Sequence, residues 1–337
     1  MRSFGVVLML LAAMLARGAD FQIAGIDFFG YGDMDLDAVR AELPVRQGDA
    51  WPEDDLQRLR DSIEGALGEQ PTDVAFVCCT PEGGRWIFIG LPGSTSKPIA
   101  FSAAPQEPLV APPELIRIAN DLDGALQASV TRGGDGVTED QSLGYALQTD
   151  PESRALQLEL REYALAHGPE ILALLTDAAN ARHRGIAATA AGYMEHSAAQ
   201  IRALRAAMSD PNPTVRNNAT RALLVLGNSG VKLAALIPTA SFIELLYSGT
   251  WSDRNKASGA LYGLTQTRDA SVFAEVKARG LEPLVEIARW DSDGHARRAK
   301  WILGRLAGLD EATIERRAGE AAFVDFCLDR IANSPQP

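Results

Sequence analysis

Four copies of a similar twelve-residue string stand in the second half of the chain. In the copy VRNNATRALLVL, small or apolar residues stand at offsets 0, 4, 7, 8 and 11, counted from zero at Val215. An α-helix places these offsets on one stripe of its surface. The spacing therefore predicts four helices, each buried along one face. The copies cover residues 183–194, 215–226, 253–264 and 295–306.

Each copy follows another apolar stretch of helical character. These stretches read PEILALLTD, AAQIRALRAAMSD, LAALIPTASFIELLYS and LEPLVEIARW. The alanines at offset 4 of successive copies are 32, 38 and 42 residues apart. A helix pair of this length cannot bury its apolar face alone, so neighbouring pairs stack. The second half of the chain is therefore predicted to be a solenoid of helix pairs.

The stretch DPNPTVRNNATRALLVLG resembles a HEAT repeat. The arginine that follows the first apolar position of such repeats is present at Arg184, Arg216 and Arg254, whereas the last copy has Ala296. The likeness covers about residues 150–310, and the segment EATIERRAGEAAFVDFCLDRIA is expected to cap the array. The resemblance implies a concave side, lined by the second helix of each pair, that holds a protein partner.

The first part of the chain has a different pattern. Residues 21–30, 74–80 and 85–91 are rich in aromatic and β-branched residues and are predicted to be strands. Two helices are expected after the first strand, one at AVRAEL and one with Pro52 in its first turn. The order strand, helix, helix, strand, strand predicts an α+β N-terminal domain, followed by the all-α solenoid.

With the residues GIDFFGYGDMDLDAVRAELPVRQGDAWPEDDLQRLRDSIEGAL, this order resembles a POTRA domain. The points of likeness are Gly30 in the first strand, a helix that ends in Leu43 and Pro44, and a turn at Gly48 and Asp49. Domains of this family dock partner chains in the periplasm or intermembrane space. The resemblance implies docking by addition of a strand to a sheet edge.

Composition and charge divide the chain. Residues 19–150 hold 23 acidic and 8 basic residues, whereas residues 151–337 hold 21 and 22, a difference typical of two domains. Residues 92–113 contain six prolines and are expected to be irregular, and TRGGDGVTED is a joint rich in turn residues. We predict a POTRA-like domain at 20–92, a linker with one helix at 93–150, and the HEAT-like solenoid with its cap at 151–334.

The first eighteen residues have the pattern of a secretory signal peptide. A basic residue precedes the apolar run FGVVLMLLAAML, and Ala16 and Gly18 offer small side chains for cleavage. The run is too short to span a bilayer comfortably. The mature protein is expected to be periplasmic or secreted, without stable membrane insertion. Its net charge of −12 argues against nucleic-acid binding, because a phosphate backbone repels such a surface.

Three cysteines, Cys78, Cys79 and Cys327, leave at least one thiol unpaired within a monomer. Neighbours on a strand point to opposite faces, so the first two cannot share one core. Either the cysteines act as small apolar residues, or one of the first two pairs with Cys327.

The chain offers few patterns that carry chemistry. Asp33, Asp35 and Asp37 have the spacing of a calcium loop, but Ala38 and Pro44 replace the required glycine and glutamate, so helix capping is the better interpretation. The Ser-x-x-Lys pattern at residues 94–97 lacks its partner motifs. The four histidines have no spacing typical of metal ligands. We predict no catalytic residue, cofactor or metal.

Offsets 2, 5, 6 and 9 of the repeat are expected to face away from the buried stripe. Aromatic and arginine side chains at such positions are common interface anchors, although an ordinary solvated face is an equal alternative. The candidates for partner binding are Asn217, Arg221, Tyr262, Arg297, Lys300 and Trp301.

Our hypothesis from the sequence is a non-catalytic adaptor of the cell envelope that binds protein partners at the concave face and at the sheet edge. Two alternatives stay open. One is an enzyme, because some HEAT-like solenoids resemble chromophore lyases. The other is a purely structural protein whose acidic domain packs on its own solenoid.

Overall fold

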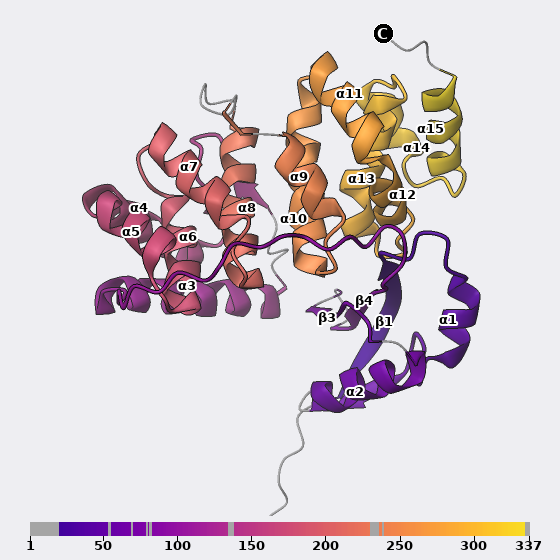
Figure 1. Cartoon of the computed structure of the whole chain (residues 1–337), viewed down its shortest axis with the longest axis horizontal. Coiled ribbons are helices and arrows are strands. Elements are labelled where there is room, and N and C mark those ends of the chain that lie inside the picture. The colour runs from indigo at the N-terminus through magenta and orange to yellow at the C-terminus, as the bar shows by residue number, and fades with distance from the viewer. Residues whose placement is uncertain are drawn as a thin grey trace, which may run out of the picture.

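The computed structural model describes residues 20–52, 55–68, 70–78, 80, 83–133, 138–229, 236–237 and 239–333. The predicted signal peptide at 1–18 lies outside these residues. Within them, a small mixed sheet at the N-terminal end is followed by a mostly helical body (Figure 1). This arrangement confirms the predicted order of an α+β part and an all-α part.

Four strands form the N-terminal sheet in the order β2-β1-β4-β3. β1 (Asp20–Phe29) runs parallel to β4 (Arg85–Gly90), and β3 (Asp73–Cys78) and β4 form an antiparallel hairpin. These three strands match the predicted ones. β2 (Ala50–Pro52) was not predicted, and it pairs with the start of β1.

Two helices lie between the strands. α1 (Leu36–Glu42) begins after Asp35, whose carboxylate accepts hydrogen bonds from the backbone N–H groups of Asp37 and Ala38. The capping role predicted for Asp35 is thereby confirmed. The second helix, α2 (Leu56–Leu67), starts later than predicted. Pro52 ends strand β2 instead of opening this helix, because the preceding residues complete the sheet.

The sheet is buried on both faces. Ile87 and Ile89 pack with Leu59 and Ile63 of α2, whereas Phe88, between the two isoleucines, packs into the core of the helical body. Side chains alternate between the faces of a strand, so residues 86–89 of β4 are all apolar because each face has its own covering layer. The N-terminal sheet therefore sits between its own helices and the body.

The body begins with α3 (Pro113–Thr131) and a short hairpin of β5 (Glu139–Asp140) and β6 (Leu147–Gln148). Helices then follow one another along a row (Figure 1). They are α4 (Pro151–Ala166), α5 (Gly168–Asp177), α6 (Ala181–Ala191), α7 (Ala198–Ala207), α8 (Pro213–Asn228), α9 (Thr239–Leu246), α10 (Trp251–Gln266), α11 (Ala270–Arg279), α12 (Leu281–Ala288), α13 (Asp293–Leu306), α14 (Glu311–Arg317) and α15 (Phe323–Ala332).

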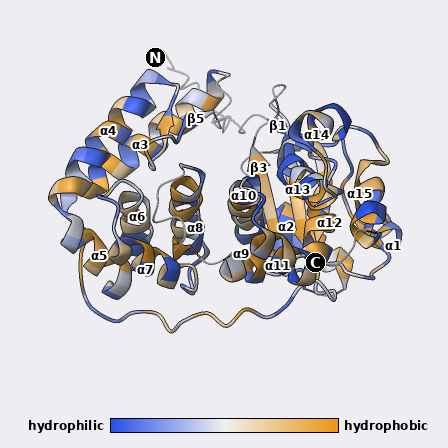
Figure 2. Ribbon diagram, turned by 90° about the horizontal axis from the view of Figure 1, so that it is seen from above, coloured by the Kyte–Doolittle hydropathy of each residue, from blue (hydrophilic) through white to orange (hydrophobic). Residues whose placement is uncertain are grey.

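The four sequence repeats lie on α6, α8, α10 and α13, which we call the repeat helices. Their anchor alanines are fully buried, as the periodicity predicts. α8 packs between α6 and α10, and α10 packs on α13. Seen from above in Figure 2, apolar residues line the sides on which the helices meet. The anchor alanines are Ala187, Ala219, Ala257 and Ala299.

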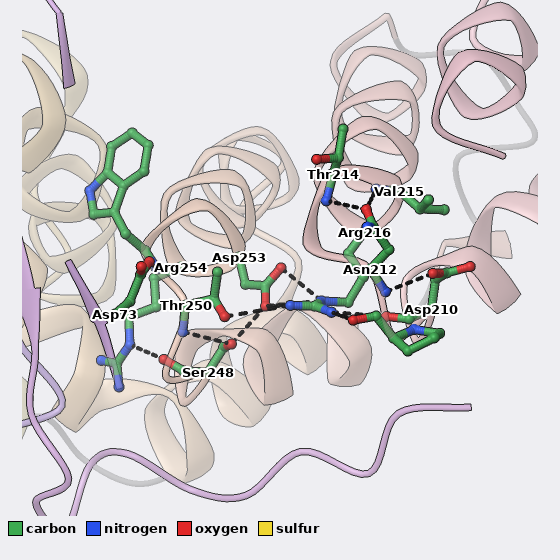
Figure 3. Close-up of polar contacts among 12 residues, drawn as sticks. Asp73, Asp210, Asn212, Thr214, Val215, Arg216, Ser248, Thr250, Asp253 and Arg254 are labelled. Atoms are coloured by element: carbon green, nitrogen blue, oxygen red, sulfur yellow. Dashed lines mark hydrogen bonds and ion pairs between the residues drawn. The ribbon is translucent and has the colours of Figure 1, made fainter. Parts of the chain in front are cut away.

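A buried arginine at offset 1 ties each of three repeat helices to the next helix pair. Figure 3 shows the middle one, in which Arg216 donates to both oxygens of Asp253 and to the backbone carbonyls of Asp210 and Pro211. The guanidinium thus closes a turn and forms an ion pair at the same time. The three pairs are Arg184–Asp210, Arg216–Asp253 and Arg254–Glu286, at 2.7, 2.9 and 3.0 Å.

The last repeat has Ala296 in place of this arginine, and the N-terminal sheet binds the turn that precedes its helix. The carboxylate of Asp27 in β1 accepts hydrogen bonds from the backbone N–H groups of Asp291 and Ser292, at 2.8 and 3.0 Å. These groups precede α13. Trp290 donates its indole N–H to the carbonyl of Phe28 in the same strand, at 2.8 Å.

Glu286 joins the sheet to the ladder of arginines. Its carboxylate pairs with Arg254 and accepts hydrogen bonds from the backbone N–H groups of Gly30 and Gly32 and from the hydroxyl of Thr95. The side chain is almost fully buried. A Cβ at Gly30 would meet the carbonyl oxygen of Leu91 at 2.5 Å, and the backbone φ is +76°, so the turn that presents this N–H group to Glu286 requires glycine.

Residues 92–112, which we call the strap, run from β4 to α3 across the row of helices (Figure 1). The strap has no regular secondary structure, as its prolines predict. Its backbone is nevertheless attached to the body. Lys97, Ser102 and Glu107 donate their N–H groups to the carbonyls of Tyr247, Ser209 and Asp177, which lie at the ends of α9, α7 and α5.

The strap also covers the ladder of arginines. The aromatic ring of Phe101 lies 3.9 Å from the guanidinium carbon of Arg216, and the carbonyl of Thr95 accepts a hydrogen bond from Arg254. The three strap residues that donate backbone hydrogen bonds to the body are five positions apart, and each bonds to a different helix pair. The strap therefore follows the repeat of the body and is held along much of its length.

Candidate functional site

The exposed strip of the repeat helices differs from the predicted one. Offset 5 was expected to face outward, but Thr220 and Ser258 at this offset are buried. Offset 3 is half-buried in all four copies. A repeat helix packs against a neighbour on each side, so its accessible face narrows to a strip near offsets 3 and 6. The offset-3 residues are Ile186, Asn218, Lys256 and Arg298.

Three of the predicted residues meet at one end of this strip. The rings of Tyr262 on α10 and Trp301 on α13 lie 6.1 Å apart in an edge-to-face arrangement. The guanidinium carbon of Arg297 lies 5.8 Å from the Trp301 ring, and that of the buried Arg305 lies 4.4 Å from the Tyr262 ring. These distances are typical of aromatic and cation–π contacts. We call Tyr262, Trp301, Arg297 and Arg305 the aromatic cluster.

Two of the candidates, Lys300 and Arg297, are engaged in ion pairs. Lys300 pairs with Asp293 at 2.9 Å and is only 16% exposed in its side chain. Arg297 pairs with Glu315 of α14 at 2.9 Å, and both side chains are 57% exposed. An exposed pair of this kind contributes little to stability and can exchange its partner. The side chain of Arg297 is therefore accessible to a ligand, whereas that of Lys300 is mostly covered by the helical body.

Arg221 on α8 lies farther along the strip. It forms an ion pair with Glu139 of the β5–β6 hairpin. The side chain of Glu139 is only 4% exposed. A groove of about 560 Å³ runs from Arg221 between α3 and the helices α6 and α8, past Asn120 and Gly185. Asn217 is half-buried on α8 and hydrogen-bonds to Asn218. The groove thus extends from the exposed strip to the side of α3.

Sequence reasoning missed two basic residues between Arg221 and the aromatic cluster. Lys256 and Arg298 both stand at offset 3, which was not assigned to the exposed face. Burial, together with the charges of Arg221 and Arg298, lowers the pKa of Lys256 to about 7. Burial and the charge of Arg221 also lower the pKa of Arg298. The basic residues at the same offset in two adjacent copies were the signal that could have revealed them.

A second set of packed rings, distinct from the aromatic cluster, lies under the sheet and separates this strip from it. Phe88 of β4 contacts the rings of Trp251, Trp290 and His295, with centroids 5.0–5.3 Å apart. Burial and the nearby Arg298 and Lys256 lower the pKa of His295 to about 4, so its imidazole is neutral at pH 7. His295, at offset 0 of the last repeat, is packed among these aromatic rings.

The remaining chemical candidates have structural places or lie outside the described residues. Cys327 is a free and buried thiol in α15, so it acts as a small apolar residue there. Cys79 and the side chain of Cys78 lie outside the described residues. Within the described part of the chain, no three His, Cys, Asp or Glu side chains gather as a metal site would require.

The amino-acid sequence matches no model of a known protein family, and no curated protein is significantly similar to it. Among the helices in the described ranges, none combines the length and the apolar character needed to cross a membrane.

Proposed function

We propose that the chain is a non-catalytic interaction scaffold of the cell envelope, built from a POTRA-like domain and a HEAT-like solenoid. The repeat helices, with one buried alanine anchor each and an arginine–acid pair between successive units, support the HEAT-like assignment. The parallel pairing of β1 with β4 and the β3–β4 hairpin support the POTRA-like one. The signal-like sequence at 1–18 favours a periplasmic or secreted location.

The aromatic cluster is the observation that carries the proposal. Tyrosine, tryptophan and arginine are the residues that most often dominate the binding energy of protein interfaces. Here Tyr262 and Trp301 are half-buried and held by Arg305, while Arg297 remains exposed beside them. Side chains that are already ordered lose less conformational entropy when a partner binds. The cluster is therefore a preorganised anchor for a protein partner.

The sheet adds a second surface. One edge of β1 is occupied by β2 and by Trp290, whereas β3 is the last strand on the other side. A partner strand would add along β3. Because the face of the sheet is packed on the body, a chain bound at β3 and one bound at the aromatic cluster would be held at a fixed separation.

Affinity capture from envelope extract with the full mature chain tests the proposal. Arg297→Glu reverses one exposed charge of the aromatic cluster and is expected to reduce capture of a specific protein about tenfold. Arg289→Glu is the matched control, because Arg289 is also an exposed arginine in a surface ion pair, with Asp325. Equal capture by both variants would contradict the use of the cluster. Absence of any specific protein would favour the purely structural alternative.

A further inference from the structure

Three basic side chains converge on the strip between the groove and the aromatic cluster. They come from successive repeat helices: Arg221 from α8, Lys256 from α10 and Arg298 from α13. A Cβ built at Gly259 would lie 3.6 Å from Nη1 of Arg298, so this guanidinium rests on α10 one turn from Lys256. The charges of both arginines act on Lys256. We call these three residues the basic cluster.

The basic cluster holds more positive charge than the nearby residues neutralise. Glu139 pairs with Arg221 and also accepts hydrogen bonds from the side chains of Gln141 and Gln148. Lys256 and Arg298 have no hydrogen-bond or ion-pair partner among the residues that the structure describes. Elsewhere in the same row, the buried Arg184, Arg216 and Arg254 each have a carboxylate of their own.

Charge in such a place is costly unless something compensates it. A half-buried cation without a counter-ion loses hydration, and like charges beside it add to the penalty. A bound anion would remove both penalties, because it supplies acceptors to Lys256 and Arg298 at once. The N–H donors of Lys256 and Arg298, unpaired among the described residues, therefore suit an anionic ligand.

We propose that Lys256 and Arg298 bind a carboxylate of an acidic segment from a protein partner. This inference rests on the proposed scaffold function and names the chemistry of what the scaffold binds. The strip favours a peptide over a small ion, because it continues in two directions from the basic cluster. On one side lies the aromatic cluster, which suits an apolar side chain, and on the other lies the groove beyond Arg221.

Titration calorimetry of the full mature chain with acetylated hexaglutamate at low salt tests the inference. The peptide is expected to bind, and Arg298→Gln is expected to weaken binding about tenfold. This substitution breaks no hydrogen bond or ion pair among the residues that the structure describes, so the fold should persist, which circular dichroism checks. Arg289→Gln is the control and should leave the affinity unchanged within about twofold. Equal affinities for the two variants, or no binding by the wild type, would overturn the inference.

A second measurement needs no substitution. An amine with a pKa of about 7 is acylated readily near neutral pH, so Lys256 should react with acetic anhydride faster than Lys277 of α11. Hexaglutamate should slow the acylation of Lys256 about fivefold or more and leave Lys277 unaffected. Unchanged acylation at saturating peptide would overturn the inference.

Inorganic phosphate is used as the ligand in a third test of the inference. If phosphate protects Lys256 as well as hexaglutamate does, the site takes a small oxyanion and the acidic-segment proposal fails. The scaffold function can be judged separately. A partner whose capture depends on Arg297 but not on Arg298 would leave the scaffold function standing and refute this inference alone.

Discussion

At the scale of single residues, this protein places arginines where most folds place apolar side chains. Arg216 is 2% exposed and its partner Asp253 is 1% exposed. Each charge is acceptable in the interior because the other, together with carbonyl and hydroxyl groups, satisfies its hydrogen bonds. The pair therefore specifies how α8 and α10 meet, and removal of one member leaves the other buried without compensation.

We expect Arg216→Ala to lower the free energy of unfolding by about 3–5 kcal/mol, because Asp253 would remain buried and charged. Arg289→Ala removes an arginine that is 51% exposed in its side chain, and it should cost less than about 1 kcal/mol. Urea unfolding of the two variants measures the difference. Equal costs would show that the buried pair does not stabilise the row.

Asp27 gives the stability a pH dependence. Burial raises its pKa to about 6, despite the two backbone N–H groups that bind its carboxylate; the neighbouring Asp291 also raises the pKa, and Arg40 lowers it. The folded state therefore holds a proton at this site over a pH range in which the unfolded chain has lost it. The contribution of Asp27 to stability is present below about pH 4 and is lost as the pH rises through about 6.

We expect the stability of the wild type, relative to that of Asp27→Asn, to fall by up to about 3 kcal/mol between pH 4 and pH 7. Unfolding in urea across this pH range measures the difference, in which the other titrating groups cancel. A difference that stays constant with pH would refute the raised pKa of Asp27.

At the scale of elements, the strap is the part whose behaviour departs most from its composition. A long irregular segment on the surface is usually more mobile than the helices and strands that it connects. Here its backbone bonds at every fifth residue to the ends of successive helix pairs, and Phe101 covers Arg216. The strap should therefore behave as an ordered layer on the body.

We expect the amide protons of Lys97, Ser102 and Glu107 to exchange slowly with solvent, because each donates to a body carbonyl. Those of Ala103 and Ala104, between two attachment points, should exchange rapidly. Hydrogen exchange resolved by residue tests this contrast. Uniformly fast exchange across residues 95–108 would mean that the strap is not held as described.

At the scale of the whole molecule, the N-terminal sheet and the helical body form one packed unit. Phe88 and Phe29 belong to the core of the body, and Glu286 joins Gly30, Gly32 and Arg254. This packing agrees with one feature of the purely structural alternative, in which the acidic N-terminal part packs on the chain's own helices. It also fixes the sheet relative to the strip of basic and aromatic residues.

We expect Glu286→Gln to lower the free energy of unfolding by about 3 kcal/mol or more, because Arg254 would lose the one carboxylate that pairs with it among the described residues. Glu315→Gln, at an exposed pair with Arg297, is the control and should cost less than about 1 kcal/mol. Chemical unfolding followed by far-ultraviolet circular dichroism measures both. Similar costs would indicate that Glu286 does not couple the sheet to the body.

The candidate surface was only partly predictable. Tyr262, Trp301 and Arg297 stand on outward offsets of adjacent repeats, and the structure brings them together. Lys256 and Arg298 escaped notice because the exposed strip is set by neighbours on both sides of each helix, which turns it toward offset 3. Periodicity locates the buried stripe of an isolated helix, but it does not show how much of the remaining surface the next helices cover.

The sequence by itself determined the elements whose signals are local. The repeat helices follow from a period of apolar residues, the cap at Asp35 from one side chain within reach of its own backbone, and the β3–β4 hairpin from adjacent strands. Only the tertiary structure decided where the sheet docks, what holds the strap and which charges lack partners. Those outcomes depend on contacts such as that between Gly30 and Glu286, 256 residues apart, which no local pattern encodes.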